Sequence, residues 1–216
     1  MNTANRQLLL WLTLFGLAFG YIEAAVVVYL REVLYPAGFT IDMLMPRPPR
    51  VLWTEVGREF ATLLLLLAVA RLAVRGGLRR FGVFAFCFGL WDLVYYLTLK
   101  VILDWPASLL DWDILFLIPA PWTAPVLAPV LVSLTLVFAG AILLLSTDEQ
   151  LPLITRRDWL IEIGAGVVIV ATFFWGVPAM AAGQAPNYFP WWLFAIGYLG
   201  GLGWFKYRWW TAWRKV

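Results

Sequence analysis

Residues 81–103 read FGVFAFCFGLWDLVYYLTLKVIL, an apolar run that contains one acid, Asp92, and one base, Lys100. A helix needs about 20 residues to cross the hydrocarbon core of a bilayer, and this run is long enough. Its aromatic and aliphatic side chains would have no apolar surroundings on the surface of a soluble protein. The run therefore predicts a transmembrane helix, with a carboxyl group inside the membrane.

A shift of 69 residues aligns this run with an earlier one and matches glycine, acidic, basic and tryptophan positions. The matched pairs are Gly20 and Gly89, Glu23 and Asp92, Arg31 and Lys100, and Trp53 and Trp122, while Trp191 follows after a further 69 residues. Self-similarity at a fixed period indicates a repeated structural unit. We expect two clear copies and a third, degenerate one.

Composition extends the membrane interpretation to the whole chain. Hydrophobic residues make up 63% of the sequence and charged residues 13%, about half the charged fraction of an ordinary soluble domain. We predict an all-α, polytopic integral membrane protein with a single transmembrane domain, residues 1–216, and three tandem parallel hairpin repeats, about 8–75, 81–146 and 159–206. The six expected spans are residues 8–34, 54–75, 81–103, 123–146, 159–179 and 190–206.

The basic residues indicate the orientation of the chain. Most of them fall at the two termini or in the connections after the second and fourth spans. These residues are Arg6, Arg71, Arg75, Arg79, Arg80, Arg156, Arg157, Lys206, Arg208, Arg214 and Lys215. Cytoplasmic loops are enriched in lysine and arginine. We therefore expect both termini on the cytoplasmic side of a membrane, which we expect to be the bacterial inner membrane. Two spans per repeat restore the orientation, which makes the repeats parallel.

The residue types that are missing exclude several kinds of site. The chain has no histidine and one cysteine, Cys87, so the common zinc and haem sites, histidine acid–base catalysis and a disulfide framework are all excluded. We predict no catalytic residues, no metal and no cofactor. The net charge of +3 comes from bases at helix ends, so we expect no nucleic-acid partner.

Glu23 and Asp92 carry the sharpest functional signal, because charged side chains inside a bilayer usually face the protein interior and mark a function. Arg31 and Lys100 follow eight residues later on a broad shared face, and pairing across repeats would need helices offset in height. Three alternatives stay open for the acids: fasteners between helices, ligands for a cation, proton or polar solute, or a general acid and base.

Further charged groups lie where the second span begins and in the expected outer connections. Glu55, Arg58 and Glu59 share one helix side and can form ion pairs, either as a solvated helix end or as a cavity wall. Residues 37–52 and 107–121 are too apolar for ordinary loops. We expect a surface helix or re-entrant turn in each, together covering the outer face.

Asp111, Trp112 and Asp113 combine acids with an aromatic ring in the second of these connections. Carboxylates and ring faces can together bind a cation or an amine. The alternative is an aromatic belt at the membrane surface with exposed acids.

These observations favour a small-solute or cation transporter, or the substrate-binding membrane component of one, that uses intramembrane carboxylates. The alternative is an integral accessory or structural subunit of a larger membrane complex, and the third hypothesis is an intramembrane enzyme acting on a lipid-soluble substrate. The bilayer is the expected surrounding. Partner subunits or a homo-oligomer are the expected protein contacts.

Overall fold

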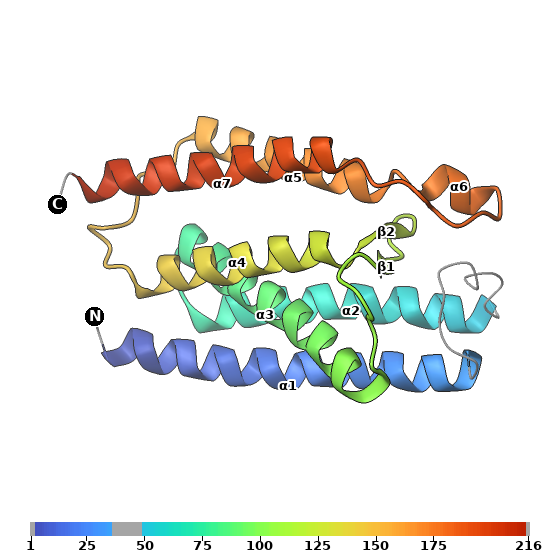
Figure 1. The fold of residues 1–216 in the computed structure, drawn as a ribbon. Helices are drawn as coiled ribbons and strands as arrows, with labels where there is room; N and C mark the ends of the chain where they lie inside the picture. The colour runs from blue at the N-terminus through green and yellow to red at the C-terminus, as the bar shows by residue number, and fades with distance from the viewer. Residues whose placement is uncertain (1–2, 36–48, 215–216) are drawn as a thin grey trace.

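A computed structural model describes residues 3–35 and 49–214 of the chain and shows a mostly helical protein (Figure 1). The helices are α1 (Thr3–Leu34), α2 (Pro49–Ala73), α3 (Gly77–Leu103), α4 (Leu127–Leu145), α5 (Arg156–Phe173), the short α6 (Val177–Ala181) and α7 (Trp191–Trp213). Each of the six expected spans coincides with a long helix to within a few residues at most ends. In the sequence, Pro36 follows the end of α1 and Pro106 follows the end of α3 within three residues. Proline lacks a backbone donor and disfavours helix at the residue before it, which is consistent with these ends. Pro178 lies instead within the first turn of α6.

In the described part of the chain, four stretches are long and apolar enough to cross a membrane: Thr3–Leu34, Gly77–Leu103, Leu127–Leu145 and Arg156–Ala181. Helix α2 is not among these four stretches, because charged residues, including Glu55, Arg58 and Glu59 in its first half, lower its apolar character. Helix α7 is long, but glycines, Lys206 and Arg208 interrupt its apolar sequence. The membrane character of the chain is therefore clear, whereas the count of six spans does not follow from these helices.

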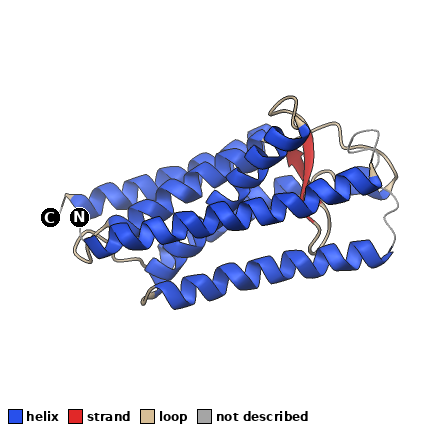
Figure 2. Ribbon diagram, turned by 90° about the horizontal axis from the view of Figure 1, so that it is seen from below, coloured by secondary structure: helices blue, strands red, loops and turns tan. Residues whose placement is uncertain are grey.

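The structure differs from the expected all-α architecture, because residues 112–125 form a β-hairpin. For residues 107–121 the expectation is a surface helix or a re-entrant turn, and the helix does not form. Strands β1 (Trp112–Phe116) and β2 (Trp122–Pro125) pair antiparallel, with a bulge between Ile114 and Phe116. Figure 2 shows both strands beside the helices, toward the end away from the termini. Strand pairing satisfies backbone groups that an irregular loop would leave unpaired. The related expectation for residues 37–52 falls largely outside the described residues.

Helix α3 is the centre of the packing, against α1 on one side and α4 on the other, while α5 packs on α7 (Figure 1). Among the described residues, α1 and α2 are not a closely packed pair, although they belong to the first expected hairpin. The start of α1 and the end of α7 lie at the same end of the molecule. These contacts do not test the 69-residue repeat, which stays a prediction.

The α3–α4 interface depends on a glycine. A Cβ atom on Gly140 would lie 2.6 Å from the backbone oxygen of Gly82 and 2.7 Å from the backbone nitrogen of Phe86. Neither backbone atom can rotate away, so only glycine permits this approach of the two helices.

We therefore expect Gly140→Ala to lower the free energy of unfolding by about 1–3 kcal/mol through overpacking. Unfolding in detergent, followed by circular dichroism, measures the loss. Gly164→Ala is the matched control, because no atom lies within 4 Å of a Cβ at that position. Equal stability of the two variants would contradict the role given to Gly140.

Candidate functional site

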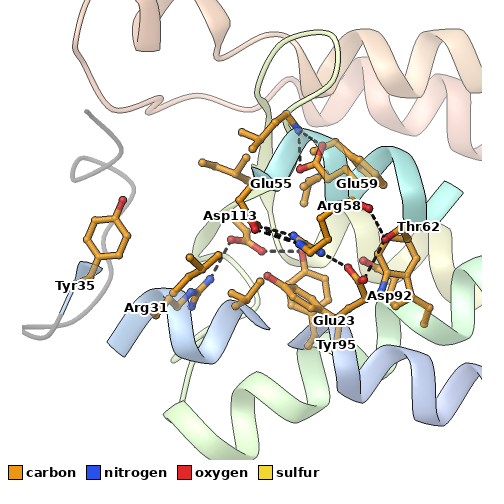
Figure 3. Close-up of a pocket in the computed structure, with 18 residues that line it drawn as sticks. Glu23, Arg31, Tyr35, Glu55, Arg58, Glu59, Thr62, Asp92, Tyr95 and Asp113 are labelled. Carbon is orange, nitrogen blue, oxygen red and sulfur yellow. Dashed lines mark hydrogen bonds and ion pairs between the residues drawn. The ribbon is translucent and has the colours of Figure 1, made fainter. Parts of the chain in front are cut away.

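A cavity of about 80 Å³ lies between α1, α2, α3 and β1, and seven of the ten predicted site residues line it (Figure 3). We call it the charged cavity. Its ionisable side chains are Glu23, Arg31, Glu55, Arg58, Glu59, Asp92 and Asp113. Glu23, Glu55 and Asp113 are at most 5% exposed, so the acids that the sequence places in or beside apolar runs turn inward.

Arg58 joins the acids of two helices. Its Nη1 donates to Glu23 on α1, and its Nη2 donates to Glu55 on its own helix over 2.8 Å. Thr62, one turn farther along α2, donates to the other oxygen of Glu23 over 3.1 Å. One guanidinium thus holds two carboxylates, and both oxygens of Glu23 have donors.

A second ion pair links α1 to the hairpin. Arg31 lies 3.3 Å from Asp113 Oδ1, and the Tyr96 hydroxyl donates to Asp113 Oδ2 over 3.2 Å. The Arg31 guanidinium also lies 3.8 Å from the ring centroid of Trp105, a distance at which a cation attracts a ring face. Asp113 on β1 is therefore fixed by α1 and α3 together.

Glu59 attaches the hairpin to α2. Its carboxylate accepts the backbone N–H of Leu117, with the shorter contact 2.8 Å. This contact gives a half-buried backbone donor just beyond β1 a hydrogen-bond partner. Acids from α2 and β1 thus hold the hairpin against the cavity.

Asp92 is the acid with the least compensation. Its Oδ2 accepts a 2.7 Å hydrogen bond from Ser133 on α4, and no ion pair to it forms within residues 3–35 and 49–214. The neighbouring Trp91 also lines the cavity, and its buried indole N–H has no hydrogen-bond partner in the same described part of the chain. A carboxylate without an ion pair among the described residues and a donor without a hydrogen-bond partner there thus follow one another at this wall.

Three predicted site residues lie elsewhere. Lys100 is exposed and pairs with Asp104 over 2.6 Å, and this hydrogen bond lowers the pKa of the Asp104 carboxyl. Asp111 accepts the backbone N–H groups of Ala107 and Ser108 and so closes the turn before β1. Trp112 packs on Phe189, with ring centroids 6.2 Å apart. The expected equivalence of Arg31 and Lys100 therefore does not extend to their surroundings.

Several side chains of the site were missed in the sequence. Tyr95 and Tyr96 line the cavity, and they follow Asp92 by three and four residues. Thr62 has the same relation to Arg58 and Glu59. Helical spacing from the acids could have found all three, because positions i+3 and i+4 share a face. Ser133 carries no such signal, since its contact depends on how α4 packs.

The acids surround the cavity without gathering at one point. Across the described residues, no three carboxylate or thiol side chains come close enough together to hold a metal ion. Comparison of the chain with families of known proteins, with curated proteins and with solved structures finds no significant match. The functional argument therefore rests on the geometry of the site.

We expect Arg58→Met to lower the free energy of unfolding by about 3 kcal/mol, because it leaves two buried carboxylates without their cation. The double variant Arg58→Met, Glu23→Gln should lose less unfolding free energy than the sum of the losses in the two single variants. Denaturation in detergent measures both effects. Arg71→Met is the control on the same helix, since Arg71 is exposed. Strict additivity would show that Arg58 and Glu23 do not interact.

Proposed function

We propose that the protein binds a small, positively charged solute inside the membrane, as a transporter for it or as the substrate-binding membrane component of one. The observation that carries this proposal is the charge of the cavity. Among the described residues, five carboxylates and two guanidiniums line it, an excess of three negative charges when all are ionised. Buried charge in a low-dielectric interior is costly. Asp92 forms no ion pair among the described residues, and a bound cation or proton would stabilise its carboxyl group.

The size of the cavity limits the solute. About 80 Å³ is well below the roughly 300–1,000 Å³ of sites for drug-sized molecules. A proton, a monovalent metal ion or a primary ammonium group fits, whereas a sugar or a lipid headgroup does not. The dispersed carboxylates favour these ligands over a divalent ion, which needs several oxygens around one point.

The exposed surface supports six spans with both termini in the cytoplasm. Glu55, Arg58 and Glu59 of α2 line the charged cavity. The exposed side chains of this helix include Trp53, Phe60 and Leu64. Helix α7 likewise exposes Ile196 and Leu199. Both helices therefore present apolar surface to lipid despite their lower overall hydropathy. With the basic connections in the cytoplasm, the charged cavity lies in the half of the membrane that faces outward.

The accessory-subunit alternative needs no internal site, so the charged cavity favours transport over it. The enzyme hypothesis needs a nucleophile or a base held against a substrate, and nothing in the cavity identifies the lipid-soluble substrate that it would act on. Binding of a cation accounts for the acid excess without a chemical step.

The test uses the full-length protein in liposomes and three probes: protons reported by internal pyranine, radioactive sodium, and radiolabelled methylammonium. We expect transport of one of the three. Asp92→Asn should lower its rate by about tenfold or more, because no base within residues 3–35 and 49–214 compensates Asp92. The matched control is Asp104→Asn. Asp104 is exposed, and its backbone has the left-handed conformation, with φ 50°. Asparagine tolerates that conformation.

Absence of transport and of binding for all three probes, with folded protein, would overturn the proposal. If the protein then also purified with a partner at fixed stoichiometry, the accessory-subunit alternative would replace it. Unchanged transport in Asp92→Asn would show that the solute does not bind at Asp92 in the charged cavity.

A further inference from the structure

A second cavity, of about 330 Å³, lies on the other side of α4, between that helix and the α5–α7 pair. We call it the apolar groove. Small residues create its space, since no atom lies within 4 Å of a Cβ placed on Gly166. The groove extends along α7 from Gly197 to Trp209, a length of about 18 Å at 1.5 Å per helical residue. An extended molecule therefore fits between the helices.

The walls of the groove are almost entirely aliphatic and aromatic. Leu136 and Leu143 come from α4, Ile169 from α5, and Leu202 and Phe205 from α7. Burying apolar atoms against such walls favours binding. The body of the occupant is therefore hydrophobic.

Two carboxyl groups, those of Asp158 and Glu162, interrupt this apolar lining. Glu162 lies on α5, and its Oε2 is 3.3 Å from a Cβ placed on Gly201 of α7. Its carboxyl group forms no hydrogen bond or ion pair with any side chain or backbone group in residues 3–35 and 49–214. A hydrophobic site with one precisely positioned polar group is the usual form of a small-molecule site.

The other charges of the groove already compensate each other. Arg208 Nε lies 2.9 Å from Asp158 Oδ1, and Trp204 donates to the same carboxylate over 3.0 Å. Arg208 also donates to the backbone oxygen of Leu153. Glu162 thus contributes the one uncompensated charge among the described lining residues, and it is negative.

From this complementarity we infer that the apolar groove binds a hydrophobic ammonium compound, with an extended apolar body and one positive charge that pairs with Glu162. The site is separate from the charged cavity and does not depend on the function proposed for it. Its volume suits a molecule that the 80 Å³ cavity is too small to hold. A membrane-soluble cation can reach it from the bilayer, because Ile163 and Trp159 beside it are exposed.

Binding is measured with the full-length protein in phosphatidylcholine nanodiscs, and empty nanodiscs correct for partitioning into lipid. The probes are decyltrimethylammonium and decanol, which share a chain and differ in charge. We expect the ammonium compound to bind at least about tenfold more tightly than decanol, and Glu162→Gln to remove most of this difference. Gly166→Leu should weaken the binding of both probes, because the leucine side chain fills part of the groove.

Gly164→Leu is the matched control for Gly166→Leu, since both glycines lie on α5 and have open space at Cβ, but Gly164 does not line the groove. It should bind both probes like the unmodified protein. Two results would overturn the inference: equal preference for the ammonium compound in Glu162→Gln, or a phospholipid that native mass spectrometry finds bound and that the ammonium compound does not displace.

Discussion

The fold around the charged cavity depends on the guanidinium of Arg58 between the carboxylates of Glu23 and Glu55. Helices α1 and α2 are not closely packed along their backbones, so long side chains join them. Removing the arginine would leave two acids buried together in a medium where like charges repel strongly. The same arrangement explains why α2 tolerates so many charges in a chain built for a membrane: its charged face is internal.

The β-hairpin depends on the same acids and bases. Asp113 extends from β1 to Arg31 and Tyr96, and Glu59 holds the backbone N–H of Leu117. The hairpin is therefore a wall of the cavity as well as a connection between α3 and α4. Two of the five acids in the cavity have structural partners of this kind. Asp92, with one hydroxyl donor and no base among the described residues, is the acid best placed to respond to a ligand.

Much of this arrangement is visible in the sequence. Apolar runs and prolines locate the long helices, since both act locally through hydrophobicity and backbone geometry. The acids Glu23 and Asp92 stand out because intramembrane charges are costly. The hairpin was missed because its strands are short and mostly apolar, so periodicity does not separate them from a helix. Prolines lie in its turn and at the end of β2. Lys100 was placed in the site by repeat symmetry, but its pairing with Asp104 follows from local helix geometry four residues away.

Helix α4 separates the two sites and contacts both. Ser133 donates to Asp92 at the charged cavity, and the hydroxyl of Thr135 bonds that of Tyr198, with both residues lining the apolar groove. These positions are two residues apart, about 200° around a helix with 3.6 residues per turn, so they point to opposite sides. Gly140 keeps the same helix in contact with α3. A rotation of α4 about its axis would change both hydrogen bonds together, because one rigid helix carries the two hydroxyl groups. The packing of α3 on α4 therefore constrains the geometry of both sites at once.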